Sequence, residues 1–334
     1  MFQFPFFILW ISIKKACWGC GGFEVIRWGR RDNKQRFKCK SCGLLFTWSN
    51  PSVRESNRFI WFRKWVIGRH TLEQLKEISG YSTRSLNRYF DSYLKKPPLL
   101  SVYPSERVNL LIDGTYFSND LCLIVYRDNT IKFTQLYRLT TGEWYEELKE
   151  DLENLQNLNV QIESITCDGH KSLLKAIAKA CPDVMVQRCL VHIQRMCRIW
   201  LTISPRTVAG IELRKIISVL HQIRTPLERD FWIVDLIRWS ELYKDFINEK
   251  SFNLNTGRYW YKHKMVRRSF MVIKRALPTM FSYLDNPRIP KSTNGLESFF
   301  GHLKGHLAIH RGLSLNHRKN FIQWYLYFKN TPSS

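Results

Sequence analysis

The stretch RVNLLIDGTYF (residues 107–117) decides the fold, because it is an apolar run that leads into an aspartate and a glycine. Its β-branched and aromatic residues predict a strand. LCLIVYRD (121–128) and TIKFTQLYRLT (130–140) predict two more strands, joined by the turn residues Asp128 and Asn129. Three consecutive strands with short connections predict an antiparallel meander.

The segments that follow alternate between helix and strand patterns. They are the helix TGEWYEELKEDLENLQNL (141–158), the strand QIESITCDG (161–169), the helix HKSLLKAIAKACP (170–182) and the strand VMVQRC (184–189). This order is the arrangement of an RNase H-like fold, in which the first strand and the strand after the first helix lie side by side. We therefore predict the α/β class, with an RNase H-like core.

Asp113 lies in the end region of the first strand of this core and Asp168 at the end of the fourth, so both are expected to face one site. Each precedes a glycine, and a turn aspartate that bonds its own backbone is the alternative for either. Two neighbouring carboxylates repel unless a cation intervenes, and oxygen ligands favour Mg²⁺ or Mn²⁺. Such ions assist phosphoryl transfer. Of the other nearby acids, Asp120 is predicted to lie in a loop and Asp128 in a hairpin turn.

A third carboxylate, Glu297, lies in STNGLESFFGHLK (292–304) and is the only acidic residue after Asp285. Asn294 precedes it by three residues, a spacing that predicts a capping box at a helix start. Asp113, Asp168 and Glu297 resemble the acidic triad of the DDE transposases, and STNGLESFF is similar to their Asn-Gly-x-Glu segment. The resemblance implies that Glu297 binds metal, that Asn294 supports the site, and that the chain cleaves and joins DNA strands.

The motif CLVH places Cys189 three residues before His192. It resembles the Cys/Asp-x-x-His signature of Mutator-related and similar transposases of bacterial insertion sequences, which implies that both residues support the site. A buried helical pair at i and i+3 is the alternative. Two ligands at this spacing do not make a zinc site.

Helical patterns fill the region before Glu297, in LERDFWIVDLIRWSELYKDFINEK (227–250) and YWYKHKMVRRSFMVIKRALPTMFSYL (259–284). Transposases of this type resemble the chain in carrying a helical insertion here. Its aromatic residues are predicted to be core, with stacking on a distorted DNA end as the alternative; they are Trp232, Trp239, Tyr259, Trp260 and Tyr261. Its basic residues form either a solvated face or a DNA path, with Arg267 and Arg268 as candidate DNA contacts.

Near the start, CWGCGGFEVIRWGRRDNKQRFKCKSCG (17–43) contains two Cys-x-x-Cys pairs, each followed by glycine. This spacing predicts a zinc ribbon with the four ligands Cys17, Cys20, Cys39 and Cys42. A redox-active or disulfide-linked quartet is the alternative. FEVIRW and QRFKC predict two strands joined by the turn GRRDNK. Basic residues, Arg30 and Arg31 among them, predict phosphate contacts, although a protein-binding ribbon fits the same pattern.

ESNRFIWFRKWVIG (55–68) and TLEQLKEISGYSTRSLNRYFDSYL (71–94) predict a helix-turn-helix. Leu72, Leu75 and Ile78 are expected to face inward, with a turn at Gly80 and a cap at Ser82. The second helix would offer Arg84, Ser85, Asn87 and Arg88 to DNA. An ordinary helical hairpin is the alternative.

The formal net charge of +24 favours a polyanionic partner, with nucleic acid ahead of a membrane surface. The apolar start FQFPFFILWISI (2–13) is too short to span a bilayer and lacks a cleavage site. Cysteines scattered in apolar segments favour a reducing bacterial cytoplasm, and DNA binding adds nucleoid association. Pairing two DNA ends implies a homodimer or larger assembly.

The predicted parts are an apolar extension (1–15), zinc ribbon (16–50), helix-turn-helix (51–95), linker (96–106), core (107–198), helical insertion (199–290) and C-terminal helices (291–334).

Three functions fit these features. A transposase would bind terminal inverted repeats and target DNA in duplex form, and use Mg²⁺ or Mn²⁺ besides the Zn²⁺ of its ribbon. A structure-directed nuclease on the same fold would cleave without joining. A transposase-derived regulator would bind DNA without catalysis.

Overall fold

The computed structural model describes residues 16–17, 19–47, 51–104, 107–118 and 120–331, with the backbone alone for residues 51–53. The predicted apolar extension (1–15) lies outside the described residues. The chain divides into two compact units, residues 1–64 and residues 65–334. In the part of the chain that is described, no helix has the length and apolar character needed to cross a membrane.

The first unit contains a small antiparallel sheet of β1 (Val25–Arg31), β2 (Lys34–Cys39) and β3 (Leu45–Thr47). The connection between β1 and β2 is a two-residue turn, in which Asp32 and Asn33 adopt φ angles of 50° and 59°. Asp and Asn tolerate this left-handed conformation better than most residues. The predicted turn was therefore too long, and the sequence did not predict β3. Cys17, Cys39, Phe37 and Phe46 form the small buried core.

Helix α1 (Pro51–Ile67) spans the division between the two units and begins earlier than the predicted Glu55. Two shorter helices follow, α2 (Leu72–Ser79) and α3 (Thr83–Leu94). The turn and cap between them are confirmed: Gly80 ends α2 with a φ of 72°, and the Ser82 side chain accepts a hydrogen bond from the Ser85 N–H. Leu75 is buried, but Ile78 is 58% exposed, so its predicted inward position is wrong.

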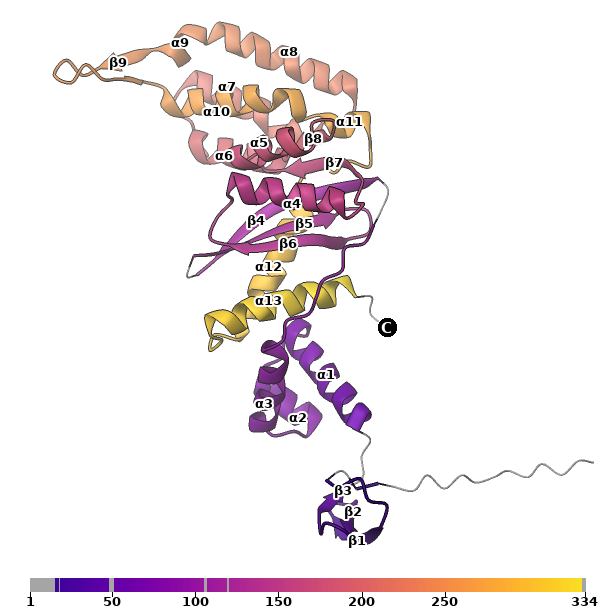
Figure 1. The fold of residues 1–334 in the computed structure, drawn as a ribbon. Helices are drawn as coiled ribbons and strands as arrows, with labels where there is room; N and C mark the ends of the chain where they lie inside the picture. The colour runs from indigo at the N-terminus through magenta and orange to yellow at the C-terminus, as the bar shows by residue number, and fades with distance from the viewer. Residues whose placement is uncertain (1–15, 18, 48–50, 105–106, 119, 332–334) are drawn as a thin grey trace, which may run out of the picture. The chain divides into compact units, whose positions relative to one another are not determined.

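A five-stranded mixed sheet forms the centre of the second unit (Figure 1). Its strands lie in the order β6 (Phe133–Thr140), β5 (Leu121–Asp128), β4 (Val108–Phe117), β7 (Ile162–Cys167) and β8 (Met185–Arg188). The first three are antiparallel, whereas β4, β7 and β8 are parallel. The predicted meander and the adjacency of the first and fourth strands of this sheet are confirmed. The Asp128 side chain accepts hydrogen bonds from the Thr130 and Ile131 N–H groups, as a hairpin turn requires.

Helices cover both faces of this sheet. One core joins Leu110, Ile112 and Ile124 of the sheet to α4 (Tyr145–Asn157) and α5 (Lys171–Ala180). Because side chains alternate along a strand, Leu111 and Asp113 lie on the opposite face. There, Leu111 lies near Gly295 of α12 (Asn294–Ile309). The last helix, α13 (Leu315–Asn330), contacts β6 and α3.

The remaining elements form a separate helical core. They are α6 (Leu190–Leu201), α7 (Val208–Ser218), η1 (Leu220–Gln222), α8 (Pro226–Leu242), α9 (Lys244–Asn248), α10 (Lys264–Ala276), η2 (Leu277–Thr279) and α11 (Ser282–Asp285). Trp232 and Trp239 are buried in this core, as predicted. The helix expected to start at Tyr259 is wrong in its first turn. Instead, β10 (Tyr259–Tyr261) pairs with β9 (Lys250–Phe252) in a hairpin that projects beyond the helices (Figure 1).

Candidate functional site

Asp113 and Asp168 lie at equivalent levels of two adjacent parallel strands. The last paired residues of β4 and β7 are Ile112 and Cys167, and the two aspartates follow directly. Asp168 ends its strand, as expected. Asp113 does not, because β4 continues to Phe117 in its pairing with β5. The aspartates therefore share the edge at which β7 stops.

Local backbone contacts fix both carboxylates. The Gly114 N–H donates to Asp113 Oδ1 at 3.0 Å, and the His170 N–H donates to Asp168 Oδ1 at 2.8 Å. Asp168 thus also makes the turn contact that was its alternative explanation. The turn requires glycine, because Gly169 has a φ of 84° and the Arg188 guanidinium occupies the space of a Cβ atom. Arg188 in turn donates to the Asp168 carbonyl oxygen at 3.1 Å.

Glu297 lies in the first turn of α12, and an arginine side chain binds its carboxylate. Arg195 of α6 donates to both carboxylate oxygens, at 3.1 Å and 2.7 Å. His192 Nε2 lies 3.5 Å from Glu297 Oε1. The predicted capping box is wrong: Asn294 is the first helical residue, and the preceding Thr293 makes no side-chain cap. The Glu297 carboxylate therefore faces α6 instead of its own helix start.

The three carboxylates interact electrostatically. Burial raises the pKa of Asp113 to about 7, with further increases from Asp168 and Glu297 and an opposing effect of His192. The three carboxylates do not converge on one point: among the described residues, only the four cysteines bring three or more metal-binding atoms within 4.8 Å of one another. Two metal ions about 3.5–4 Å apart would need ligands that are spread over a similar distance, not ligands that meet at one point. The hard oxygen donors suit Mg²⁺ or Mn²⁺.

Cys189 and His192 form one network with Thr293. The Cys189 thiol accepts from the Thr293 N–H at 3.3 Å and the Thr293 hydroxyl at 3.4 Å, and it lies 3.3 Å from His192 Nδ1. The hydrogen bond to Cys189 raises the pKa of His192 to about 9. Burial acts to raise the pKa of Cys189, but hydrogen bonds from His192 and Thr293 outweigh it and lower that pKa. This network ties the start of α6 to the start of α12, one turn before Glu297.

Sequence reasoning missed a second pair of ionisable residues beside the aspartates. Glu143, in the loop before α4, lies 3.4 Å from His170 through Oε2 and Nδ1. Burial raises the pKa of Glu143, and Asp168 raises it further. No sequence signal distinguishes Glu143, because it precedes a helix that is rich in glutamate. Arg195 was also missed, although its i+3 spacing from His192 would place both on one helix face.

The four predicted zinc ligands come together in the first unit. The sulfurs of Cys17 and Cys42 lie 3.6 Å apart, as do those of Cys20 and Cys39. A tetrahedral ion with zinc–sulfur bonds of about 2.3 Å would separate its ligands by about 3.8 Å. The described cysteines form no disulfide. The cluster could therefore hold Zn²⁺.

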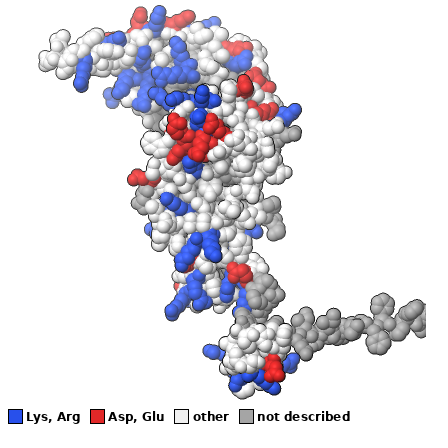
Figure 2. Space-filling model, in the orientation of Figure 1, with Lys and Arg blue, Asp and Glu red and all other residues white. Residues whose placement is uncertain are grey.

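Basic side chains gather on α10 and around it (Figure 2). A pocket of about 420 Å³ lies there, lined by Trp200, Tyr261, Met271, Val272 and the cations Lys171, Lys264, Arg267, Arg268 and Arg275. Arg268 lies 4.3 Å above the Trp200 ring, and Arg267 lies 3.9 Å above the Tyr261 ring. Lys171 follows Asp168 by three residues, so this basic groove leads toward the carboxylates.

The other candidate DNA contacts lie on exposed surfaces. Arg30 and Arg31 are exposed on β1, and Arg84 and Arg88 are exposed on α3. Asn294, which was predicted to support the carboxylate site and not to contact DNA, is exposed and lines a pocket with Gln194 and Arg198. These positions suit contacts with a large partner better than with a small ligand.

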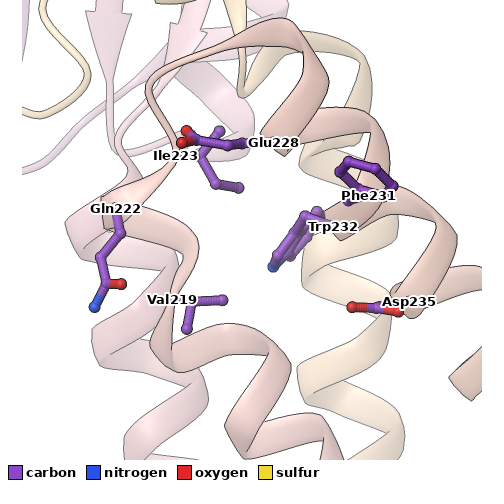
Figure 3. Close-up of a pocket in the computed structure, with 7 residues that line it drawn as sticks. All are labelled: Val219, Gln222, Ile223, Glu228, Phe231, Trp232 and Asp235. Carbon is purple, nitrogen blue, oxygen red and sulfur yellow. The ribbon is translucent and has the colours of Figure 1, made fainter.

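A second pocket of about 420 Å³ lies between α8 and the segment before it (Figure 3). Phe231 and Trp232 line it together with Val219 and Ile223, and its polar side chains are those of Gln222, Glu228 and Asp235. Its lining contains fewer ionisable side chains than the site around Asp113. None of the described residues that line it is a lysine, arginine or histidine.

Residues 137–222 match a family model described as "Transposase, Mutator family". The match begins in β6 and ends at η1, so it includes Asp168, Cys189 and His192. It confirms that this part of the chain resembles the Mutator family of transposases, as noted from CLVH. The comparison with curated proteins found no match.

Proposed function

We propose that this chain is a DNA transposase with a DDE active site on an RNase H-like core. The order β6–β5–β4–β7–β8, with three antiparallel strands followed by parallel pairing, supports this core. The observation that carries the proposal is the parallel register of Ile112 with Cys167, because it sets Asp113 and Asp168 side by side. Glu297 contributes the third carboxylate from α12, on the same side of the sheet as Asp113.

Asp113, Asp168 and Glu297 would hold Mg²⁺ or Mn²⁺. Bound ions would activate the attacking oxygen and stabilise the leaving oxygen of a phosphodiester. The chain's own contribution is placement: the Gly169 turn fixes Asp168, and the network of Cys189, His192 and Thr293 fixes α12. Alignment of the reacting groups accounts for much of the rate in such transfers. Water would serve as the nucleophile for cleavage and a DNA 3′-hydroxyl for joining.

We assign the binding of DNA ends to residues 16–95. The four-cysteine cluster would hold Zn²⁺ in a ribbon, and α2 and α3 would form a helix-turn-helix on terminal inverted repeats. Arg30, Arg31, Arg84 and Arg88 would contact phosphates there, and Arg267 and Arg268 near the active site. Two ends must meet, so we infer a homodimer or larger assembly. The work would take place in a bacterial cytoplasm, at the nucleoid.

End-labelled DNA that flanks the gene of this chain tests the proposal. With Mg²⁺ or Mn²⁺, the wild type should nick and join it, while Asp113→Asn and Glu297→Gln should lose both products. The matched control Asp120→Asn changes an exposed loop carboxylate on the same β-hairpin and should stay active. Products from Glu297→Gln at the wild-type rate would contradict the triad. Nicks without joined strands would indicate the nuclease, and binding without cleavage would indicate the regulator.

A further inference from the structure

The β9–β10 hairpin presents apolar side chains to solvent from an ordered turn. Leu254, at its tip, is 98% exposed. The turn beneath it is well defined: the Asn253 side chain accepts from the Asn255 and Thr256 N–H groups, and Gly257 has a φ of 64°. Phe252, Tyr259 and Trp260 of the same hairpin are also more than half exposed, and a group of exposed apolar side chains, unlike a single one, marks an interaction surface.

The two faces of this hairpin differ. Phe252 and Tyr259 are paired across the strands, and their rings lie 6.1 Å apart. On that face Lys250 lies 4.4 Å above the Tyr259 ring. On the opposite face Trp260 is paired with Ser251, so no ring lies opposite the indole, which is 51% exposed. The hairpin therefore offers Trp260 and Leu254 for contact.

The base of the hairpin is firmly anchored. Glu249 pairs with Lys262 and with His263, whose ring stacks on Phe246 at 3.5 Å. Arg267 covers the Tyr261 ring and thus joins the hairpin to α10. A rigid arm loses little conformational entropy when its tip enters a partner.

Charge identifies the partner as a polyanion. Between Glu249 and Asp285 the sequence contains lysines and arginines and no acidic residue. The basic groove continues from Tyr261 at the hairpin base to Lys171, near Asp168. An apolar protein partner would not require so one-sided a charge. A groove of B-DNA, in contrast, accommodates a two-stranded ribbon, and apolar side chains can wedge between its base steps.

We infer that the β9–β10 hairpin is a DNA-inserting arm. Leu254 and Trp260 enter the base stack next to the scissile phosphate, while the basic groove on α10 holds the neighbouring phosphates. This inference rests on the proposed action on DNA, and it goes further by naming the distorted DNA segment and the residues that distort it.

The test uses the full chain carrying Asp113→Asn, so that bound DNA is not cleaved. The probe is a duplex of the flanking DNA of its own gene, with 2-aminopurine near the predicted cut. The parent should increase the 2-aminopurine fluorescence by unstacking bases. Leu254→Ser and Trp260→Ala should lose that increase and bind about tenfold or more weakly. Their slope of log affinity against log salt should not change, because no phosphate contact is removed.

Leu227→Ser, at an exposed leucine of α8, is the matched control and should behave as the parent. Arm variants that bind and unstack the duplex like the parent would overturn the inference and leave the proposed function standing. Arm variants that change only the sedimentation of the chain would assign the arm to contacts between copies, which also overturns it. Failure of the parent to bind the duplex would overturn the inference and the proposed end binding together.

Discussion

Arg195 holds both carboxylate oxygens of Glu297 across a sequence separation of 102 residues. The same oxygens are the ones that a metal ion would need. The guanidinium therefore fixes the direction of Glu297 toward α6 and also competes with a cation for it. DNA phosphates entering the site would offer Arg195 another anionic partner and free the carboxylate.

Replacing Arg195 with alanine is therefore expected to strengthen metal binding in the absence of DNA. The pair is partly exposed, so we expect a gain in Mn²⁺ affinity of only about two- to fivefold. Calorimetric titration of Mn²⁺ into the free protein measures it. Arg195→Lys keeps the charge without the two-pronged geometry and should show a smaller gain. Weaker Mn²⁺ binding by Arg195→Ala would instead mean that Arg195 mainly positions Glu297 for the metal.

Asp113 should make the metal-free protein less stable as pH rises. Its carboxyl has a pKa of about 7 when folded, against 3.8 as the unperturbed value. The unfolded chain thus loses this proton first, so stability falls between about pH 4 and pH 7 and stays low above that. Asp113→Asn removes the effect and should add about 2–4 kcal/mol to the free energy of unfolding at pH 7.5.

Urea unfolding with and without Mg²⁺ checks this prediction. Added Mg²⁺ should stabilise the wild type by binding the folded state alone, and it should leave Asp113→Asn unchanged. Asp120→Asn, in the exposed loop, should follow the wild type. An Asp113→Asn protein less stable than the wild type at pH 7.5 would rule out the raised pKa as the dominant effect.

The sheet and the adjacency of Asp113 and Asp168 could be predicted from the sequence because their signals are local. The strands around Asp113 and Asp168 are apolar runs of ordinary strand length, and their order along the chain determines which of them pair. The contacts of Glu297 could not be predicted in this way. Thr293 directs its hydroxyl to Cys189 and His192, more than 100 positions away, and so leaves no local cap for α12.

The hairpin was mistaken for a helix for a related reason. Tyr259, Trp260 and Tyr261 fit a helical or an extended pattern equally well, since three residues are too few to show a period. The extended conformation is determined by the pairing with Lys250–Phe252 and by the ion pair of Glu249 with Lys262. Glu143 and Arg195 are common residue types, and only the folded chain brings them to the site.

Removing the Cys189 thiol should destabilise the fold and disturb His192 together. Cys189→Ala leaves the buried Thr293 N–H and hydroxyl without their acceptor, at an expected cost of about 2–4 kcal/mol in the free energy of unfolding. The pKa of His192 should fall from about 9, since its main cause is the bond to Cys189. Urea unfolding and NMR titration of the His192 ring measure these effects. Cys189→Ser keeps an acceptor and should lie between alanine and the wild type.

Removal of metal from the four-cysteine cluster should unfold the β1–β3 sheet and spare the larger unit. Among the described residues of the first unit, the buried core consists of Cys17, Cys39, Phe37 and Phe46, which is too small to fold without a metal. A chelator should abolish hydrogen-exchange protection in β1 and β2 without lowering the melting temperature of residues 65–334. Cys39→Ser should give the same pattern and no further response to the chelator. Full protection of β1 and β2 after metal removal would contradict a structural zinc site.

Two glycines that follow the aspartates offer a matched pair of substitutions. At Gly169 a Cβ atom would overlap the buried Arg188 guanidinium, and the φ of 84° is strained for alanine. Gly169→Ala should therefore cost at least about 2 kcal/mol of stability and displace Asp168, with loss of DNA cleavage.

At Gly114 the added Cβ would lie 2.6 Å from Glu143 Oε1, the end of a side chain on a loop, which can move aside. Gly114→Ala should cost about 1 kcal/mol or less and keep cleavage. Thermal unfolding and the end-labelled cleavage assay compare the two variants. Equal effects would show that the turn at Gly169 does not determine the position of Asp168.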